Sequence, residues 1–170
     1  MQTELEPVLQ DLKDAFDAEV SEFRGDVRLQ ISSDKIVSLC QKMRDELGFT
    51  LLSTMTAVDL GISKDPRFNV LYHFTSVTAN LSLGVLVDVS ATDPTLPTIT
   101  GVFKNAAWRE RELWDLFGIK FEGHPDLRRI VMPDDWPGHP LRKDHPLGYE
   151  EPQFTFNYKE IDSRKPYARE

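Results

Sequence analysis

The chain has 170 residues, 40% of them hydrophobic and 28% charged, which indicates one folded domain with room for an arm rather than two full domains. Its 28 acidic residues outnumber its 20 basic ones, and the resulting net charge of -8 disfavours nucleic acid and anionic lipid as partners. The single cysteine, Cys40, excludes an internal disulfide and a zinc or iron–sulfur site built from several thiolates of this chain.

The first third of the sequence predicts two helices and a strand. Apolar residues recur at helical spacing over residues 4–23, which predicts an amphipathic helix with its acidic side in water. Residues 27–31 alternate between apolar and polar, as in a strand buried on one side. Helical spacing returns over residues 36–47 and places Cys40 in the core.

The middle of the sequence predicts three strands of an antiparallel meander, rich in Val, Leu, Phe and Thr. These strands cover residues 49–58, 68–75 and 81–89. A proline-punctuated loop should follow at residues 92–97, and then a helix over residues 106–117 that Gly118 ends. The pattern predicts an α+β fold, with a two-layer domain and a mixed, largely antiparallel sheet.

The C-terminal part is rich in proline. Seven of the eleven prolines lie in the last fifty residues, so this part cannot be mostly helical. We expect an α+β domain over residues 1–120, an irregular segment over residues 121–147 packed on it, and an extended tail over residues 148–170. Short strand pieces are expected at residues 119–121 and 129–132.

The helix over residues 106–117 carries a concentration of charge. Glu112 and Asp115 are one turn apart, and Arg111 is four residues before Asp115, so two carboxylates and a guanidinium could meet on one face. Such a group could form a proton or metal site. The alternative is a solvated charged face above an aromatic core, which is the commoner role of surface charges.

Four further residues raise the possibility of a metal centre. His124, His139 and His145 lie within 22 residues, near Asp135, and could serve a stand-alone metal hydrolase. Each of these histidines directly precedes a proline, and their spacings of 15 and 6 match no ligand pair on one helix. We keep the hydrolase as the alternative from a different functional class.

Three motifs resemble one known family. They are ERELWDLFG at residues 110–118, HPDLRRIVMPDDW at residues 124–136 and GHPLRKDHPL at residues 138–147. In order and spacing they resemble the 30 kDa subunit, also known as the C subunit, of respiratory complex I, the proton-pumping NADH:quinone oxidoreductase. The resemblance implies a noncatalytic structural subunit of the hydrophilic arm, peripheral to the membrane on its cytoplasmic face.

The resemblance also implies where the cofactors lie. This chain should hold none, whereas FMN, iron–sulfur clusters and quinone should be bound by its partners, the large quinone-site subunit and the cluster-bearing subunits. Electrons would pass from NADH along those cofactors to quinone. The equivalent subunit of a membrane-bound hydrogenase or of a ferredoxin-dependent quinone oxidoreductase is an alternative.

On this interpretation, charged and aromatic side chains form the partner interface, and no residue is catalytic. The candidates are Arg109, Glu112, Asp115, His124, Arg128, Arg129, Trp136, His139, Arg142, Lys143, Phe154, Phe156 and Tyr158. The basic side chains could donate to partner carboxylates, and the aromatic ones could anchor the contact. We also expect Glu112, Asp115, His124 and Arg128 to form one rigid polar junction.

Overall fold

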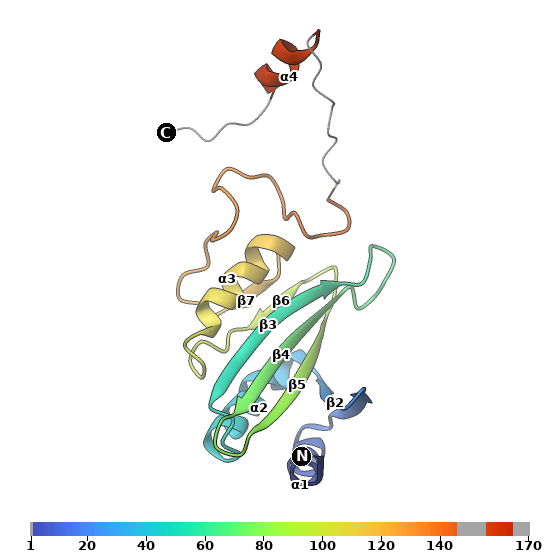
Figure 1. Cartoon of the computed structure of the whole chain (residues 1–170), viewed down its shortest axis with the longest axis vertical. Coiled ribbons are helices and arrows are strands. Elements are labelled where there is room, and N and C mark those ends of the chain that lie inside the picture. The colour runs from blue at the N-terminus through green and yellow to red at the C-terminus, as the bar shows by residue number, and fades with distance from the viewer. Residues whose placement is uncertain (1, 146–155, 165–170) are drawn as a thin grey trace.

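The computed structural model describes residues 2–145 and 156–164 (Figure 1). Its elements, in chain order, are helix α1 (Gln2–Phe16), strands β1 (Glu19–Phe23) and β2 (Asp26–Ile31), the short 3-10 helix η1 (Ser33–Lys35), helix α2 (Ile36–Asp45), strands β3 (Leu51–Asp59), β4 (Phe68–Ser76), β5 (Leu81–Val89) and β6 (Thr95–Pro97), helix α3 (Ala106–Phe117), strand β7 (Lys120–Glu122) and helix α4 (Tyr158–Arg164). None of the helices in these described ranges is long and apolar enough to cross a membrane.

The main sheet has five strands in the order β1-β2-β5-β4-β3. Strands β3, β4 and β5 form the predicted antiparallel meander, and β1 pairs antiparallel with β2. The pairing of β2 with β5 is parallel, so the sheet is mixed and largely antiparallel. The predicted α+β fold is therefore confirmed.

One hydrophobic core joins the sheet to the helices. Alternate residues of β4, from Phe68 to Phe74, point into it, as expected for a strand whose side chains alternate between two faces. Helix α2 contributes Leu39, Cys40 and Met43, all fully buried. Cys40 is thus a core residue, as its helical spacing predicts.

The predicted first helix is too long. Helix α1 ends at Phe16, because Asp17 adopts a left-handed φ of 53° and the chain then enters β1. Arg24 and Gly25, with φ values of 54° and 87°, form the two-residue turn between β1 and β2. Residues 19–23 therefore make ladder hydrogen bonds with β2, although their apolar spacing also suits a helix.

A second small sheet corrects another prediction. The loop expected at residues 92–97 contains β6, which pairs in parallel with β7. The prolines around β6 do not prevent this, because a strand of three residues in a two-stranded sheet needs few ladder bonds. Strand β7 confirms the piece expected near residues 119–121, and α3 has the predicted bounds of 106–117.

Two expectations for the C-terminal part are wrong. Residues 129–132 form no strand, because the backbone N–H groups of this stretch bind a side chain of α3. Within the tail expected to be extended, α4 is helical, and the i, i+3 spacing of Tyr158 and Ile161 suits a helix as well as an extended chain. Phe154 lies outside the described residues.

Candidate functional site

The carboxylate of Asp115 holds the irregular chain that follows β7. Asp115 lies in α3 and is fully buried. Its Oδ2 accepts hydrogen bonds from the backbone N–H groups of Ile130, Val131 and Met132, at 3.0, 2.8 and 2.9 Å. Burial alone raises the pKa of Asp115, but these donors and the Arg129 side chain outweigh it and lower the pKa to about 2. Asp115 is therefore a charged internal anchor.

The guanidinium of Arg129 extends this anchor. Its Nη1 donates to Oδ1 of Asp115 at 2.6 Å, and its Nη2 donates to the carbonyl oxygens of Trp136 and Gly138, at 2.8 and 3.1 Å. The guanidinium also lies near the ring of Trp114, 5.8 Å from its centroid. Because these donors join α3 to the chain at residues 136–138, Arg129 fixes the path of residues 129–138.

Arg111 makes a parallel set of contacts. Its guanidinium donates to the carbonyl oxygens of Arg128 and Arg129, at 3.0 and 2.9 Å, and lies over the ring of Trp108. The expected meeting of Arg111 with the Asp115 carboxylate is replaced by these backbone contacts. Arg111 therefore fixes the backbone at residues 128 and 129, next to the residues that Asp115 binds.

Gly118 and His139 pack against each other where α3 ends. Gly118 has a left-handed φ of 75°, and a Cβ placed on it would lie only 2.6 Å from Cδ2 of His139. The His139 Nδ1 lies 2.9 Å from the carbonyl oxygen of Asp115, and the Leu141 N–H donates to the carbonyl oxygen of Leu116 at 3.0 Å. A residue without a side chain is thus needed at position 118.

A second anchor lies where β3 ends and β4 begins. The buried Arg67 donates through Nη2 to Asp59 at 2.8 Å and to Asp144 at 2.9 Å. The backbone N–H of Lys143 also donates to Asp59 at 2.8 Å. Hydrogen bonds from Arg67 hold the pKa of Asp59 well below its usual range and lower that of Asp144 to about 2. We call residues 128–145, held by these two anchors, the anchored segment.

Glu110 is a third buried acid, and the sequence interpretation missed it. It accepts hydrogen bonds from the Thr98 hydroxyl at 2.5 Å and the Ile99 N–H at 2.8 Å. Burial raises its pKa to about 7. A signal was available, because positions 106, 110, 113 and 117 of α3 are all buried and follow helical spacing.

The four residues expected to form one polar junction are separate. Glu112 is partly exposed and lies 3.6 Å from Arg109, and the exposed Arg128 pairs with Asp126. The His124 ring contacts the carbonyl oxygen of Ala107, while Asp115 binds the anchored segment. The predicted junction is therefore wrong.

The structure does not support the alternative of a metal centre. Within residues 2–145 and 156–164, no three His, Cys, Asp or Glu side chains lie close enough to share an ion. His124 and His139 instead contact backbone carbonyl oxygens, those of Ala107 and Asp115. The set His124, Asp135, His139 and His145 thus gives the hydrolase hypothesis no site.

The remaining candidates lie at or near the surface. Trp136, Arg142 and His139 are partly buried, and Arg109, Lys143, Phe156 and Tyr158 are exposed. The Arg142 guanidinium lies over the ring of Phe68 and 3.3 Å from Asp144, so it belongs to the second anchor.

The two anchors leave apolar side chains facing solvent. Val131 is 57% exposed and Leu141 is 51% exposed, and Ile130 and Trp108 are also exposed. Scattered exposed apolar residues are common, but Ile130, Val131 and Leu141 lie on irregular chain that buried charges hold in one conformation, and Trp108 lies beside them on α3. A preorganised surface of this kind suits the docking of another protein, because little chain entropy is lost on binding.

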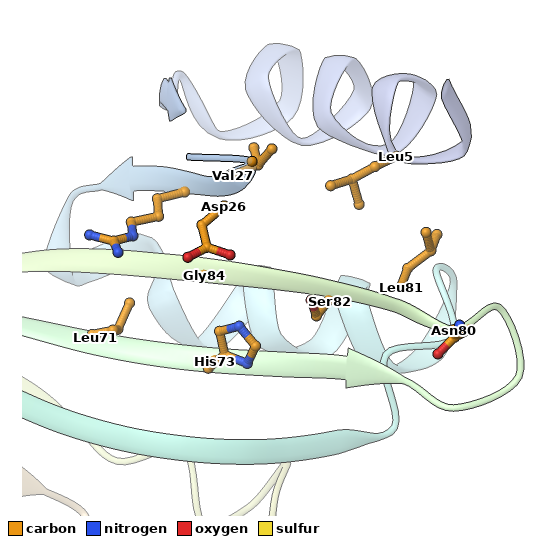
Figure 2. Close-up of a pocket in the computed structure, with 11 residues that line it drawn as sticks. Leu5, Asp26, Val27, Leu71, His73, Asn80, Leu81, Ser82 and Gly84 are labelled. Carbon is orange, nitrogen blue, oxygen red and sulfur yellow. The ribbon is translucent and has the colours of Figure 1, made fainter. Parts of the chain in front are cut away.

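A pocket of about 280 Å³ lies between α1 and the outer face of the sheet (Figure 2). Leu5, His73, Leu81 and Gly84 are among its lining residues. Its lining contains none of the predicted interface residues that the structure describes. The pocket is therefore separate from the anchored segment.

Fold and site together define a class of protein: a small α+β subunit that uses buried charges to present an irregular segment. The family model "Respiratory-chain NADH dehydrogenase, 30 Kd subunit" matches residues 29–151. The chain belongs to this 30 kDa family of complex I and is a component of NADH:quinone oxidoreductase. The resemblance found in the sequence is confirmed.

Curated relatives support this assignment. The C subunit of NADH-quinone oxidoreductase from Roseiflexus sp. (strain RS-1) is 45% identical over 152 residues, which cover 88% of this chain and 87% of the relative. Its counterpart of the same name from Geotalea uraniireducens (strain Rf4) is 49% identical over 129 residues, covering 76% and 78%.

Two solved structures share the fold. The trypsin-resistant fragment (1-134) of Nqo5 is 31% identical with a TM-score of 0.66, over 72% of this chain and 98% of the fragment. A chain from the membrane-bound sulfane sulfur reductase, an archaeal respiratory membrane complex, is 23% identical with a TM-score of 0.73, over 99% and 96%. The second likeness concerns the fold alone.

Proposed function

We propose that this chain is a noncatalytic structural subunit of the hydrophilic arm of NADH:quinone oxidoreductase, peripheral to the membrane on its cytoplasmic face. FMN, the iron–sulfur clusters and quinone are bound by its partners, the large quinone-site subunit and the cluster-bearing subunits. Membership of the family supports this proposal, as does the single, fully buried cysteine. Electrons from NADH then reach quinone through those partners.

The observation that carries the proposal is how the charged motifs are used. Asp115, Arg111 and Arg129 bind the chain's own backbone, and the residues left at the surface of the anchored segment include Val131 and Leu141. A reaction centre would need its ionisable groups directed toward substrate. Here those three charges are used within the protein, and the surface combines apolar side chains with exposed basic residues such as Arg128, which can donate to partner carboxylates at the rim.

The same surface would serve in a related membrane-bound assembly. A chain of the sulfane sulfur reductase complex has the same fold, so the fold is compatible with that second candidate. The Roseiflexus and Geotalea relatives, at 45% and 49% identity, are both named as subunits of NADH-quinone oxidoreductase, which favours the NADH-linked enzyme.

The test introduces charge into the proposed docking surface. Val131→Asp and Leu141→Asp in the full chain should lower the amount of intact complex while the quinone reductase rate per intact complex stays unchanged. An unpaired carboxylate buried at an interface costs several kcal/mol, and each ~1.4 kcal/mol weakens binding tenfold.

The matched control is Val77→Asp. Val77 is 67% exposed but lies in the turn between β4 and β5, at the far end of β4 from the second anchor (Figure 1). It should leave assembly unchanged. Normal amounts of complex with a rate depressed about a hundredfold in the Val131 or Leu141 variants would mean that this subunit takes part in the chemistry.

A further inference from the structure

Glu110 is an acid enclosed in the core without a compensating cation. In the part of the chain that the structure describes, no lysine or arginine lies within ion-pair distance of its carboxyl group, and the nearest basic side chain is His124 at 4.0 Å. Both side chains are almost wholly buried. Its two hydrogen-bond donors, Thr98 and Ile99, belong to the loop that follows β6. The carboxyl group thus joins α3 to the β6–β7 pair.

The His124 ring makes its hydrogen bonds to backbone groups. Its Nδ1 accepts the backbone N–H of Asp126 at 3.0 Å, and its Nε2 lies 3.1 Å from the carbonyl oxygen of Ala107. These partners assign the ring proton to Nε2. Both ring nitrogens are thus occupied by backbone partners, and the ring makes no hydrogen bond to Glu110, which lies 4.0 Å from Nε2.

Two threonines connect Glu110 to the surface. The Thr98 hydroxyl lies 2.5 Å from Glu110 and 2.9 Å from the hydroxyl of Thr100, and the Thr100 N–H donates to Thr98 at 3.2 Å. Both threonines are partly exposed. This is a continuous hydrogen-bond chain from the buried carboxyl group to the edge of the protein.

The hydrogen-bond chain through Thr98 and Thr100 accommodates both protonation states of Glu110. When the carboxyl group is ionised, the Thr98 hydroxyl donates to it and the Thr98 oxygen accepts from Thr100. When it is protonated, its O–H donates to Thr98, whose own O–H turns to Thr100. Neither state leaves a hydroxyl or a carboxyl oxygen of this chain without a partner, since Ile99 N–H still donates to the other oxygen.

We propose that Glu110 is a buried proton-binding site, supplied from solvent through the hydroxyls of Thr98 and Thr100, which makes the packing of α3 on the β6–β7 pair responsive to pH. The reaction is the addition of one proton to the carboxylate, with no other bond formed or broken. The site concerns the chain itself and does not depend on the proposed function.

The other ionisable groups around Glu110 cannot offset its charge. Cys40 of α2 and Tyr72 of β4 are fully buried, and burial followed by nearby negative charge, including that of Glu110, raises the pKa of each. Both are therefore neutral around neutral pH. Burial likewise raises the pKa of Glu110 to about 7, against the lowering effect of Thr98 and Ile99.

The direction of the pH effect follows from proton binding. An acid whose pKa rises from 4.5 to about 7 on folding binds a proton in the folded state that the unfolded chain has released at the same pH. The contribution to stability is therefore present below pH 4.5 and is lost as the pH rises through about 7.

Infrared difference spectroscopy of the full chain tests the site directly. The C=O band of a protonated, buried carboxylic acid should be present at about pH 5 and disappear with a midpoint near pH 7. Glu110→Gln should lack this band. Glu112→Gln, a change two residues along the same helix at a partly exposed acid, should keep it.

Variants of Thr98 test the hydrogen-bond chain. Thr98→Val should shift the midpoint to higher pH, because it removes a donor that stabilises the carboxylate, and Thr98→Ser should restore it. The proposal is overturned if the wild-type band is already lost with ordinary carboxyl groups below about pH 5, or if the band persists in Glu110→Gln.

Discussion

Replacing Asp115 by asparagine should detach the anchored segment from α3. The change keeps the shape of the side chain but removes its charge, and one of its two acceptor oxygens becomes an amide donor. In one orientation that donor faces Arg129, and in the other it faces the N–H groups of Ile130, Val131 and Met132. Either orientation leaves buried donors opposed to each other.

The structure sets the size of the effect. A carboxyl group whose pKa falls from 3.8 to about 2 on folding contributes about 2.5 kcal/mol at neutral pH. Removing one member of a buried ion pair typically costs about 3 to 5 kcal/mol, because the other charge is left uncompensated. The free energy of unfolding should therefore fall by about 2.5 to 5 kcal/mol, a large part of the stability of a domain this size.

Two measurements on the full chain check this prediction. Urea unfolding gives the loss of stability, and hydrogen exchange should show selective loss of protection at the amides of residues 130–132. The control is Glu112→Gln, which removes a partly exposed charge from the same helix and should change stability by less than about 1 kcal/mol. A stability for Asp115→Asn within about 0.5 kcal/mol of wild type, with those amides still protected, would refute the anchoring argument.

Three further outcomes follow from the same geometry. Arg67→Met should lower the free energy of unfolding by about 3 to 5 kcal/mol in urea titrations, because it leaves the buried carboxylate of Asp59 without its main partner; a change below about 1 kcal/mol would contradict the second anchor. Gly118→Ala should lower the free energy of unfolding by about 1 to 3 kcal/mol, because position 118 has a positive φ and the new Cβ would meet the His139 ring. Gly101→Ala, whose Cβ would have no atom within 4 Å, should leave stability unchanged. Equal shifts in melting temperature for the two variants would contradict the close approach of His139 to Gly118. Acid should unfold the chain as the carboxylates of Asp115 and Asp144 become protonated, because the lowered pKa of each gives stability that is lost as the pH falls below 3.8 toward about 2. Variants that remove Arg67 or Arg129 should begin this acid unfolding at a higher pH.

Helices and strands whose apolar residues repeat with a clear helical or alternating spacing could be predicted from the sequence. The β3–β4–β5 meander and α3 were found because their apolar residues alternate or recur over nine to twelve positions. The boundary of α1 was missed because the residues of β1 also fit helical spacing, and the break depends on the backbone at Asp17 and the turn at Arg24 and Gly25. This turn forms because β1 pairs with β2, and the spacing of apolar residues within β1 does not show that pairing.

The site was predictable only in part. The motifs identified the family and the residues concerned, but the partners of those residues lie far along the chain, since Asp115 binds residues 14 to 17 positions away and the Lys143 amide binds Asp59 across 84. Spacing within a helix therefore paired Asp115 with the wrong neighbours. Glu110 differs, because its place on the buried stripe of α3 marks it as a core acid without any knowledge of the fold.

The role of Asp115 explains how a highly charged motif supports a docking surface with exposed apolar side chains. An irregular segment lacks the regular hydrogen bonds of a helix or sheet that would satisfy its backbone N–H groups, and buried N–H groups without partners lower stability. Asp115 supplies acceptors to three of these donors at once, which no neutral side chain can match. Because Asp115 and Arg129 satisfy its backbone from inside, the segment can turn Val131 and Leu141 outward, beside exposed charges such as Arg128 and Lys143 at the surface that a partner would meet.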